Sequence, residues 1–116
     1  MLELEWKGVP LEHSKKWQDI FQLSPPSEGM HLAAACPVCG ANSLFRYFAL
    51  GRAEPREIQG IKVKGSGSYW EWCSRCRSFE HMSVWVPEWW QVDPLKIDHE
   101  KLTARPDLLD AAVAAA

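Results

Sequence analysis

Four cysteines stand in two pairs, and each pair has the spacing of a metal-binding turn. Cys36 and Cys39 form the first pair, and Cys73 and Cys76 form the second, with 33 residues between the pairs. Two such pairs supply four thiolates, which is the complete ligand set of a tetrahedral zinc ion. The two-residue spacing allows a tight turn in which both sulfur atoms point to one side and backbone N–H groups face them. The sequence therefore predicts one zinc ion bound by all four cysteines.

Disulfides, free structural thiols and redox chemistry are the other uses of paired cysteines. A reducing cytosol disfavours disulfides, and a redox dithiol needs only one pair, which leaves the second pair without a role. Histidine can replace cysteine as a zinc ligand, and the histidines considered for this are His31, His81 and His99. Because four thiolates are available, we expect each of these rings to be a surface or core side chain.

The residue that follows each pair bears on the shape of the turn. Gly40 follows the first pair, at a place where a positive φ is often needed and costs glycine little. Arg77 occupies the equivalent place after the second pair. Either Arg77 adopts an uncommon backbone conformation, or the second turn has a different shape.

The predicted zinc is structural, because four protein ligands leave no position for water or substrate. Zinc binding contributes about 10–16 kcal/mol in finger peptides, which is comparable with the ~5–15 kcal/mol stability of a whole domain. A chain of 116 residues buries a core of modest size, so a contribution of this kind matters to its stability.

No catalytic motif accompanies the cysteines, and we expect no enzymatic activity. Residues 65–68 (Gly-Ser-Gly-Ser) lack the rest of a phosphate-binding loop and indicate a flexible turn. Serine, histidine and acidic residues do not form a nucleophile signature. The carboxylate pairs Glu54/Glu57 and Glu71/Glu80 are expected to be solvated or to pair across strands with Arg52, Arg56 and Arg75.

Seven tryptophans form the second prominent signal. Trp72 and Trp85 lie in apolar strand-like segments and are predicted to build the core of a small sheet. The adjacent Trp89 and Trp90 cannot easily both be buried, and tryptophan is enriched at binding hot spots. We therefore predict a partner-binding surface around the second tryptophan pair, with the candidate residues Glu88, Trp89, Trp90 and Asp93.

Two helices are predicted, one near each end of the chain. Residues 12–23 place Trp17, Ile20 and Phe21 at helical spacing. Pro106 and Asp107 open a second helix, in which the residues expected to face the core are Leu108, Leu109, Ala112 and Val113. A short strand or arm is expected at residues 2–6, before the first helix.

Strand character is concentrated between the helices, in residues 43–50, 57–64, 68–72 and 78–86. The first two segments are expected to form a hairpin inserted between the cysteine pairs. The Cys-Pro-Val-Cys-Gly run at 36–40 resembles zinc-ribbon modules, in which two knuckles at the ends of β-hairpins hold one zinc ion. The predicted fold is therefore α+β: an antiparallel β-sheet with a zinc-ribbon four-cysteine site, flanked by an N-terminal and a C-terminal helix.

The chain is expected to form a single domain, residues 1–116. Its parts are an N-terminal strand and helix segment (1–35), the zinc-ribbon β region (36–86) and an acidic C-terminal segment with a helix (87–116). The net charge is -2 overall, +4 over residues 36–79 and -4 over residues 80–116. The sequence has no run of 18 apolar residues, and acidic residues stand where a signal peptide has basic ones, so we expect a soluble, cytoplasmic protein with no membrane partner.

Residues 68–81, followed by 86–90, resemble small bacterial proteins encoded beside polymorphic secreted toxins of the contact-dependent or Rhs type and identified as their immunity partners. This resemblance implies a cytosolic, non-enzymatic protein that binds and neutralises one cognate toxin. Residues that contact a toxin vary within such families, so only the zinc ligands carry over by position. A closed metal site and an acidic C-terminal third also favour a protein-binding module.

Nucleic-acid binding is the alternative function, because basic residues alternate with aromatic ones in the central region. The basic residues in question are Arg46, Arg52, Arg56, Lys62, Lys64, Arg75 and Arg77. Charge argues against this function, since four thiolates and one zinc ion add -4 + 2 = -2 and lower the central charge from +4 to about +2. An accessory zinc ribbon of a larger enzyme complex is a third possibility. No small-molecule substrate is inferred.

Overall fold

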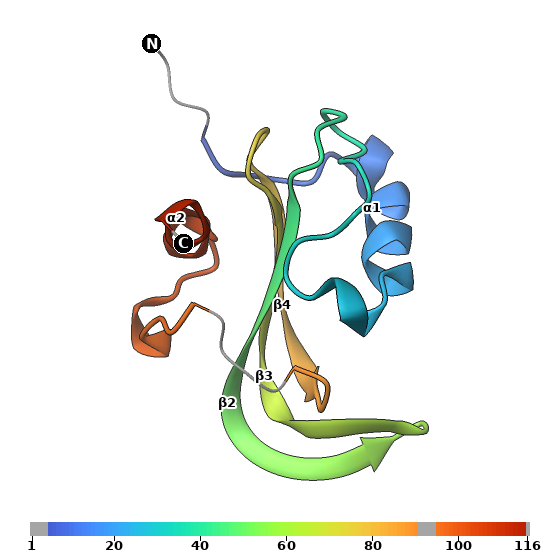
Figure 1. Ribbon diagram of the computed structural model, residues 1–116, viewed down its shortest axis with the longest axis vertical. Helices are drawn as coiled ribbons and strands as arrows, with labels where there is room; N and C mark the ends of the chain where they lie inside the picture. Colours follow the sequence, from blue (N-terminus) through green and yellow to red (C-terminus); the bar gives the residue numbers. More distant parts are fainter. Residues whose placement is uncertain (1–4, 91–94, 116) are drawn as a thin grey trace.

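The computed structural model describes residues 5–90 and 95–115, and a four-stranded sheet forms its centre (Figure 1). The strand order is β1-β4-β3-β2. The strands are β1 (Lys7–Gly8), β2 (Leu44–Ile58), β3 (Ile61–Cys73) and β4 (Ser78–Pro87). The fold is α+β as predicted, but the sheet is mixed rather than antiparallel throughout, because β1 runs parallel to β4.

Two helices lie on opposite faces of this sheet (Figure 1). They are α1 (Leu11–Leu23) and α2 (Asp107–Ala115), and short 3₁₀ turns occur at η1 (Pro26–Glu28) and η2 (His99–Lys101). Both helices match the predicted segments closely. Of the strand predicted at residues 2–6, residues 2–4 lie outside the described chain, and the first described strand begins at Lys7.

Side chains alternate along β3, and this alternation attaches a different helix to each face. Glu71 points toward α1 and accepts a hydrogen bond of 2.9 Å from the indole N–H of Trp17. Trp72 points the other way, and its indole N–H donates to Oδ1 of Asp110 in α2 at 3.1 Å. Leu109 of α2 is fully buried, whereas Leu108, which we expected to face the core, is 43% exposed.

The core consists of two clusters, one for each face. The first contains Leu109 of α2 together with buried residues of the sheet and of the segment after it: Tyr47, Ala49, Trp70, Trp72, Val86 and Trp90. The second contains two residues of α1, two cysteines and two leucines: Trp17, Phe21, Leu32, Cys36, Leu44 and Cys73. The four-cysteine region therefore belongs to the core on the α1 face.

The hairpin between the cysteine pairs is longer than predicted. Residues 43–50 and 57–64 are not two separate strands, because β2 continues to Ile58 and β3 starts at Ile61. Gln59 and Gly60 form the two-residue turn, with φ of 51° and 82°, which matches the preference of tight hairpins for two residues of positive φ. Pro55 does not end β2, because β2 is an edge strand and proline is tolerated there.

The flexible turn predicted at residues 65–68 is instead part of β3, at a bend. Gly65 and Gly67 lie so close to β2 that a Cβ atom would clash with the backbone carbonyl oxygen of Arg52 or of Ala49. Glycine at these two positions lets β2 and β3 bend together. The distal part of the hairpin, residues 51–64, curls toward the α1 side of the sheet (Figure 1); we call it the hairpin arm.

Among the described residues, no helix has both the length and the apolar character needed to cross a membrane.

Candidate metal centre

Strand pairing brings the two cysteine turns together at the open end of the β2–β3 hairpin. Leu44 at the start of β2 is paired with Cys73 at the end of β3. Just beyond that pair, the N–H of Ser74 donates to the carbonyl oxygen of Ser43 at 2.9 Å. The turn that precedes β2 therefore lies beside the turn that joins β3 to β4.

The four sulfur atoms lie within 4.8 Å of one another. The Sγ atoms of Cys36 and Cys76 are 3.9 Å apart, and those of Cys39 and Cys73 are 3.6 Å apart. Tetrahedral zinc with Zn–S bonds of about 2.3 Å requires a sulfur–sulfur distance of roughly 3.8 Å. The thiols, none of which is in a disulfide, thus have the spacing that a metal ion needs.

Both turns have the same backbone geometry. The N–H of Gly40 donates to the carbonyl oxygen of Cys36 at 2.8 Å, and the N–H of Arg77 donates to that of Cys73 at 3.0 Å. Gly40 has a φ of 80° and Arg77 has a φ of 62°. Of the two possibilities left open by the sequence, the structure shows that Arg77 adopts the uncommon backbone conformation. Its guanidinium lies 5.3 Å from the ring centre of Trp6.

Backbone N–H groups point at the sulfur atoms in both turns. The N–H of Val38 lies 3.4 Å from Sγ of Cys36, and the N–H of Cys76 lies 3.5 Å from Sγ of Cys73. Such donors partly offset the negative charge of thiolate ligands.

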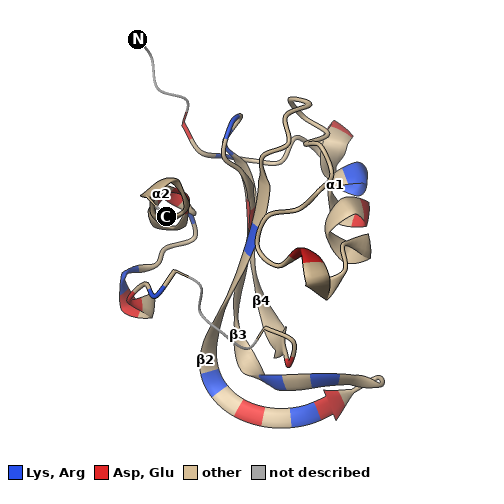
Figure 2. Ribbon diagram, viewed as in Figure 1, with Lys and Arg blue, Asp and Glu red and all other residues tan. Residues whose placement is uncertain are grey.

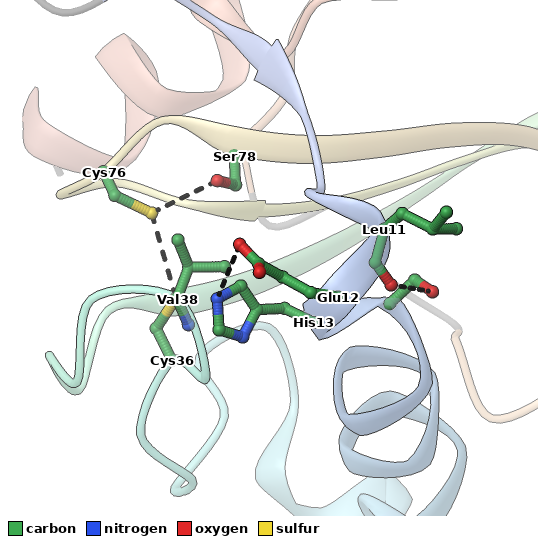
Figure 3. Close-up of polar contacts among 8 residues, drawn as sticks. Leu11, Glu12, His13, Cys36, Val38, Cys76 and Ser78 are labelled. Atoms are coloured by element: carbon green, nitrogen blue, oxygen red, sulfur yellow. Dashed lines mark hydrogen bonds and ion pairs between the residues drawn. The ribbon is translucent and has the colours of Figure 1, made fainter.

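Two serine hydroxyls complete the surroundings of the sulfur atoms. The hydroxyl of Ser43 lies 2.9 Å from Sγ of Cys73, and that of Ser78 lies 3.4 Å from Sγ of Cys76. Figure 3 shows Cys36 and Cys76 facing each other, with Ser78 beside the sulfur of Cys76 and the first turn of α1 alongside.

Burial affects the thiols unequally. Burial raises the pKa of Cys36 to about 12 and also raises the pKa of Cys39. Burial of Cys73 acts in the same direction, but hydrogen bonds from Ser43 and from backbone N–H groups outweigh it and lower the pKa of that thiol. Metal binding at this site must therefore displace protons from buried thiols.

The three histidines considered as ligands do not belong to the cysteine cluster. His31 stacks on Phe45 with ring centres 4.5 Å apart, and His81 packs on Trp70 at 4.9 Å. The ring of His99 lies 6.5 Å from that of Tyr47. In the described part of the chain, the group of side chains able to hold a metal ion consists of cysteines alone.

The predicted partner-binding residues separate into buried and exposed positions. Trp90 is only 8% exposed and packs on Tyr47 and Phe48, whereas Trp89 is 37% exposed and Glu88 is also exposed. Asp93 lies outside the described residues.

The basic residues considered for nucleic acid do not form one exposed patch. Arg46 is 2% exposed and donates to the carbonyl oxygens of Gly29 and Pro25 at 2.6 and 2.8 Å. The other basic residues of β2 and β3 lie on the hairpin arm, where acidic residues alternate with those of β2 but not with those of β3 (Figure 2). Arg56 pairs with Glu54 at 2.5 Å, as a charge pair rather than an acid/base pair.

A groove of about 810 Å³, which the sequence did not reveal, lies on the α1 face of the sheet. α1 and the hairpin arm bound it, and its apolar lining includes Phe48, Tyr69, Met82, Trp85 and Trp89. The prediction that Trp85 is a core residue is wrong, because its ring is 38% exposed. Arg56 covers part of this ring, with the guanidinium 4.8 Å from the ring centre.

Glu71 also lines this groove. The prediction that it is solvated is wrong, because its side chain is buried. Burial raises the pKa of this carboxyl to about 7, although hydrogen bonds from Trp17 and Tyr69 oppose the shift. The period-two alternation of Tyr69 and Glu71 with Trp70 and Trp72 is the sequence signal that could have placed Glu71 on an inner face.

Comparison of the chain with models of known protein families, with curated proteins and with solved structures found no match.

Proposed function

We propose that this chain is a non-enzymatic protein-binding module built around one structural zinc ion, and that it acts as an immunity protein that neutralises a cognate bacterial toxin. The observation that carries the proposal is the cluster of four thiols, whose sulfur atoms lie within 4.8 Å of one another and two of which are buried in the core. Cys36 and Cys73 are 2% and 0% exposed and belong to the cluster that holds α1.

Zinc fits the cluster better than magnesium or calcium. Four sulfur ligands at tetrahedral spacing favour zinc over magnesium or calcium, which prefer oxygen. With four protein ligands the ion has no free position, so its role is to hold the fold in the manner of a zinc ribbon. Elemental analysis of protein purified without chelator is expected to give close to one equivalent of zinc. Less than a tenth of an equivalent, together with two disulfides by mass, would contradict the zinc assignment.

Protein binding is favoured over nucleic-acid binding by the charges around the exposed aromatic side chains. Arg46 is buried against backbone carbonyls, and Arg56 is paired with Glu54. Glu80 lies in the lining of the groove beside its cross-strand neighbour Glu71, and the carboxylate of Glu80 would repel phosphate. A tetrathiolate zinc centre adds a further net charge of -2.

The toxin-neutralising role is supported by the resemblance of residues 68–81 and 86–90 to immunity proteins, and by the exposed aromatic side chains of the groove. Protein interfaces draw much of their affinity from a few aromatic anchors. We expect the chain to bind the product of the adjacent gene and to bind DNA and RNA weakly.

The experiment combines two binding assays. The first is a pull-down with the product of the adjacent gene, and the second is titration with labelled single- and double-stranded DNA and RNA at two salt concentrations. Trp89→Ala is expected to cost about 2 kcal/mol or more of protein affinity, whereas Leu11→Ala, which removes a side chain that is 90% exposed at the start of α1, serves as the control and is expected to be neutral. Sub-micromolar, salt-sensitive binding to nucleic acid with an empty pull-down would reverse the assignment.

A further inference from the structure

The outer edge of β4 is open over most of its length. β1 pairs with β4 only at Ser78 and Phe79, and among the described residues no strand continues this pairing from Glu80 to Val86. The N–H of Lys7 donates to the carbonyl oxygen of Arg77, which shows that this carbonyl group points outward, whereas the N–H of Arg77 donates within the cysteine turn.

Backbone alternation then identifies the other outward groups on this edge. Every second residue of a strand directs its N–H and C=O to the same side. Counting from Arg77, the outward groups beyond β1 belong to His81, Ser83 and Trp85, and all three residues are exposed. These positions form a row of donors and acceptors with the geometry that a further strand requires.

The intervening residues of the same strand line the groove. Glu80, Met82 and Val84 are partly exposed and contribute to its lining. Since side chains of neighbouring strands on one face lie side by side, a strand added to β4 would place every second side chain next to these three residues, at the groove.

The groove offers apolar surface and, at Glu80, a carboxylate. Large apolar side chains in its lining are exposed, with Ile61 at 61%, Trp85 at 38% and Trp89 at 37%. Glu80 lies beside Glu71 on the adjacent strand. Arg46, one residue further across the sheet, is held by the carbonyl oxygens of residues 24, 25 and 29. Among the described residues, no cation forms an ion pair with Glu80.

From these observations we infer that the edge of β4 from Glu80 to Val86 binds an extended segment of the partner protein as an added strand. Alternate apolar side chains of that segment enter the groove, and a lysine or arginine lies beside Glu80. This inference rests on the proposed protein-binding function and specifies its mode, in which backbone hydrogen bonds supply affinity and the groove supplies specificity.

The test uses a phage-displayed library of random twelve-residue peptides as the probe, selected on the full-length, zinc-loaded chain. We expect enriched peptides to have an apolar residue at every second position and to contain a lysine or arginine.

Synthetic copies of these peptides are then titrated against variants of the chain. Ser83→Pro removes an outward N–H without removing a donor to β3, and it is expected to weaken binding at least tenfold. His81→Pro makes the same change at another outward position and replaces the first variant if that one loses its zinc or its cooperative melting.

Charge is tested with a matched pair of variants. Glu80→Lys is expected to weaken the basic peptides at least fivefold and to strengthen copies in which their lysine is replaced by glutamate. Glu100→Lys makes the same change of charge at an exposed residue of η2, outside the groove lining, and it is expected to alter binding less than twofold.

Three results would overturn the inference: no enriched peptide, peptides that bind both proline variants as tightly as the wild type, or an edge occupied by a second copy of the chain. Self-association through the edge would appear as a dimer in light scattering that Ser83→Pro converts to a monomer. Binding of the adjacent gene product that is unaffected by either proline variant would also refute the edge site while leaving the proposed function intact. Peptide binding at the edge with no binding of that product would refute the function alone.

Discussion

A single buried carboxyl group, that of Glu71, ties α1 to the sheet. It accepts a hydrogen bond from the indole of Trp17, and burial raises its pKa to about 7. An ordinary glutamate titrates near 4.5, so between these two pH values the folded chain holds a proton that the unfolded chain has lost. The free energy of unfolding therefore falls as pH rises through this window.

We predict that stability declines between about pH 4.5 and 7 by up to ~3 kcal/mol from this group. Glu71→Gln cannot ionise but keeps an oxygen that can accept from Trp17, so it should flatten the decline and make the chain more stable at pH 8. Urea unfolding across this pH range measures the effect. Glu57→Gln, on the exposed part of the hairpin arm, is the control and should leave the decline in place; an unchanged profile in the Glu71 variant would contradict the assignment.

Cys39 provides the sharpest test of the metal at the scale of one residue. It is the exposed member of the cysteine cluster, so its replacement removes little packing. We predict that Cys39→Ser lowers the zinc content and reduces the melting temperature by about 10 °C or more, because part of a large metal-binding free energy is lost.

Ser74→Ala is the control for Cys39→Ser, since Ser74 lies within the second cysteine turn but contributes no thiol. Calorimetry with and without chelator measures both variants. A Cys39→Ser protein that melts at the wild-type temperature would show that the metal does not hold the fold.

The role of a single residue could be predicted from the sequence where it depends only on the spacing of residues close together in the chain. The two cysteine pairs and the question posed by Arg77 could be taken from the sequence. For Trp85 and Glu71, strand alternation gives the face of the sheet but not the exposure, which depends on where the arm and α1 lie. Trp85 lies where β4 forms the edge of the sheet and is partly covered by Arg56, whereas α1 lies over Glu71.

The sequence predicted the two helices more accurately than it predicted the β2–β3 hairpin. α1 and α2 were predictable because an apolar stripe of helical period is a local property. The hairpin was not, since Gly65 and Gly67 have the composition of a turn but serve a bend, whereas the true turn at Gln59 and Gly60 lacks the Asn-Gly or Asp-Gly signature. Close approach of two backbones is a tertiary property that composition does not show.

The bend of β2 and β3 at Gly65 and Gly67 leads to a prediction about stability. A Cβ atom at Gly67 would clash with the carbonyl oxygen of Ala49 and lie 3.0 Å from a methyl group of Val86. Gly67→Ala should therefore destabilise the chain by about 2–4 kcal/mol in urea unfolding. Gly8→Ala is the matched control, because nothing lies within 4 Å of a Cβ atom there. Equal stabilities of the two variants would refute the role assigned to the bend.

At the scale of the whole molecule, the two faces of the sheet depend differently on the metal. Cys36 and Cys73 share a core cluster with Trp17 and Phe21 of α1, whereas Leu109 of α2 belongs to the other cluster. The charge blocks of the sequence gave no indication of this division, because it arises from the alternation of side chains along the strands.

Metal removal should therefore loosen α1 before α2. We predict that a chelator reduces the hydrogen-exchange protection of α1 amides at least tenfold more than that of α2 amides, since local opening follows the cluster that loses its support. Mass spectrometry of exchanged peptides measures both helices in one sample. Addition of excess zinc is the control and should restore α1; simultaneous loss in both helices would indicate one cooperative unit instead.

The position of the cysteine turns at the open end of the β2–β3 hairpin has a consequence for the order of folding. In an unfolded chain, a metal ion held by the first pair could reach the second only by closing a loop of 33 residues, an event with an entropic cost that grows with loop length. A hairpin that starts at Gln59 and Gly60 closes that loop in small local steps, and its last pair, Leu44 with Cys73, brings the two turns together. Complete coordination is then the final event of hairpin formation. At high zinc concentration, the rate of complete coordination should stop rising and equal the rate at which the strands pair. The metal therefore binds all four cysteines after the hairpin has formed and does not initiate its formation.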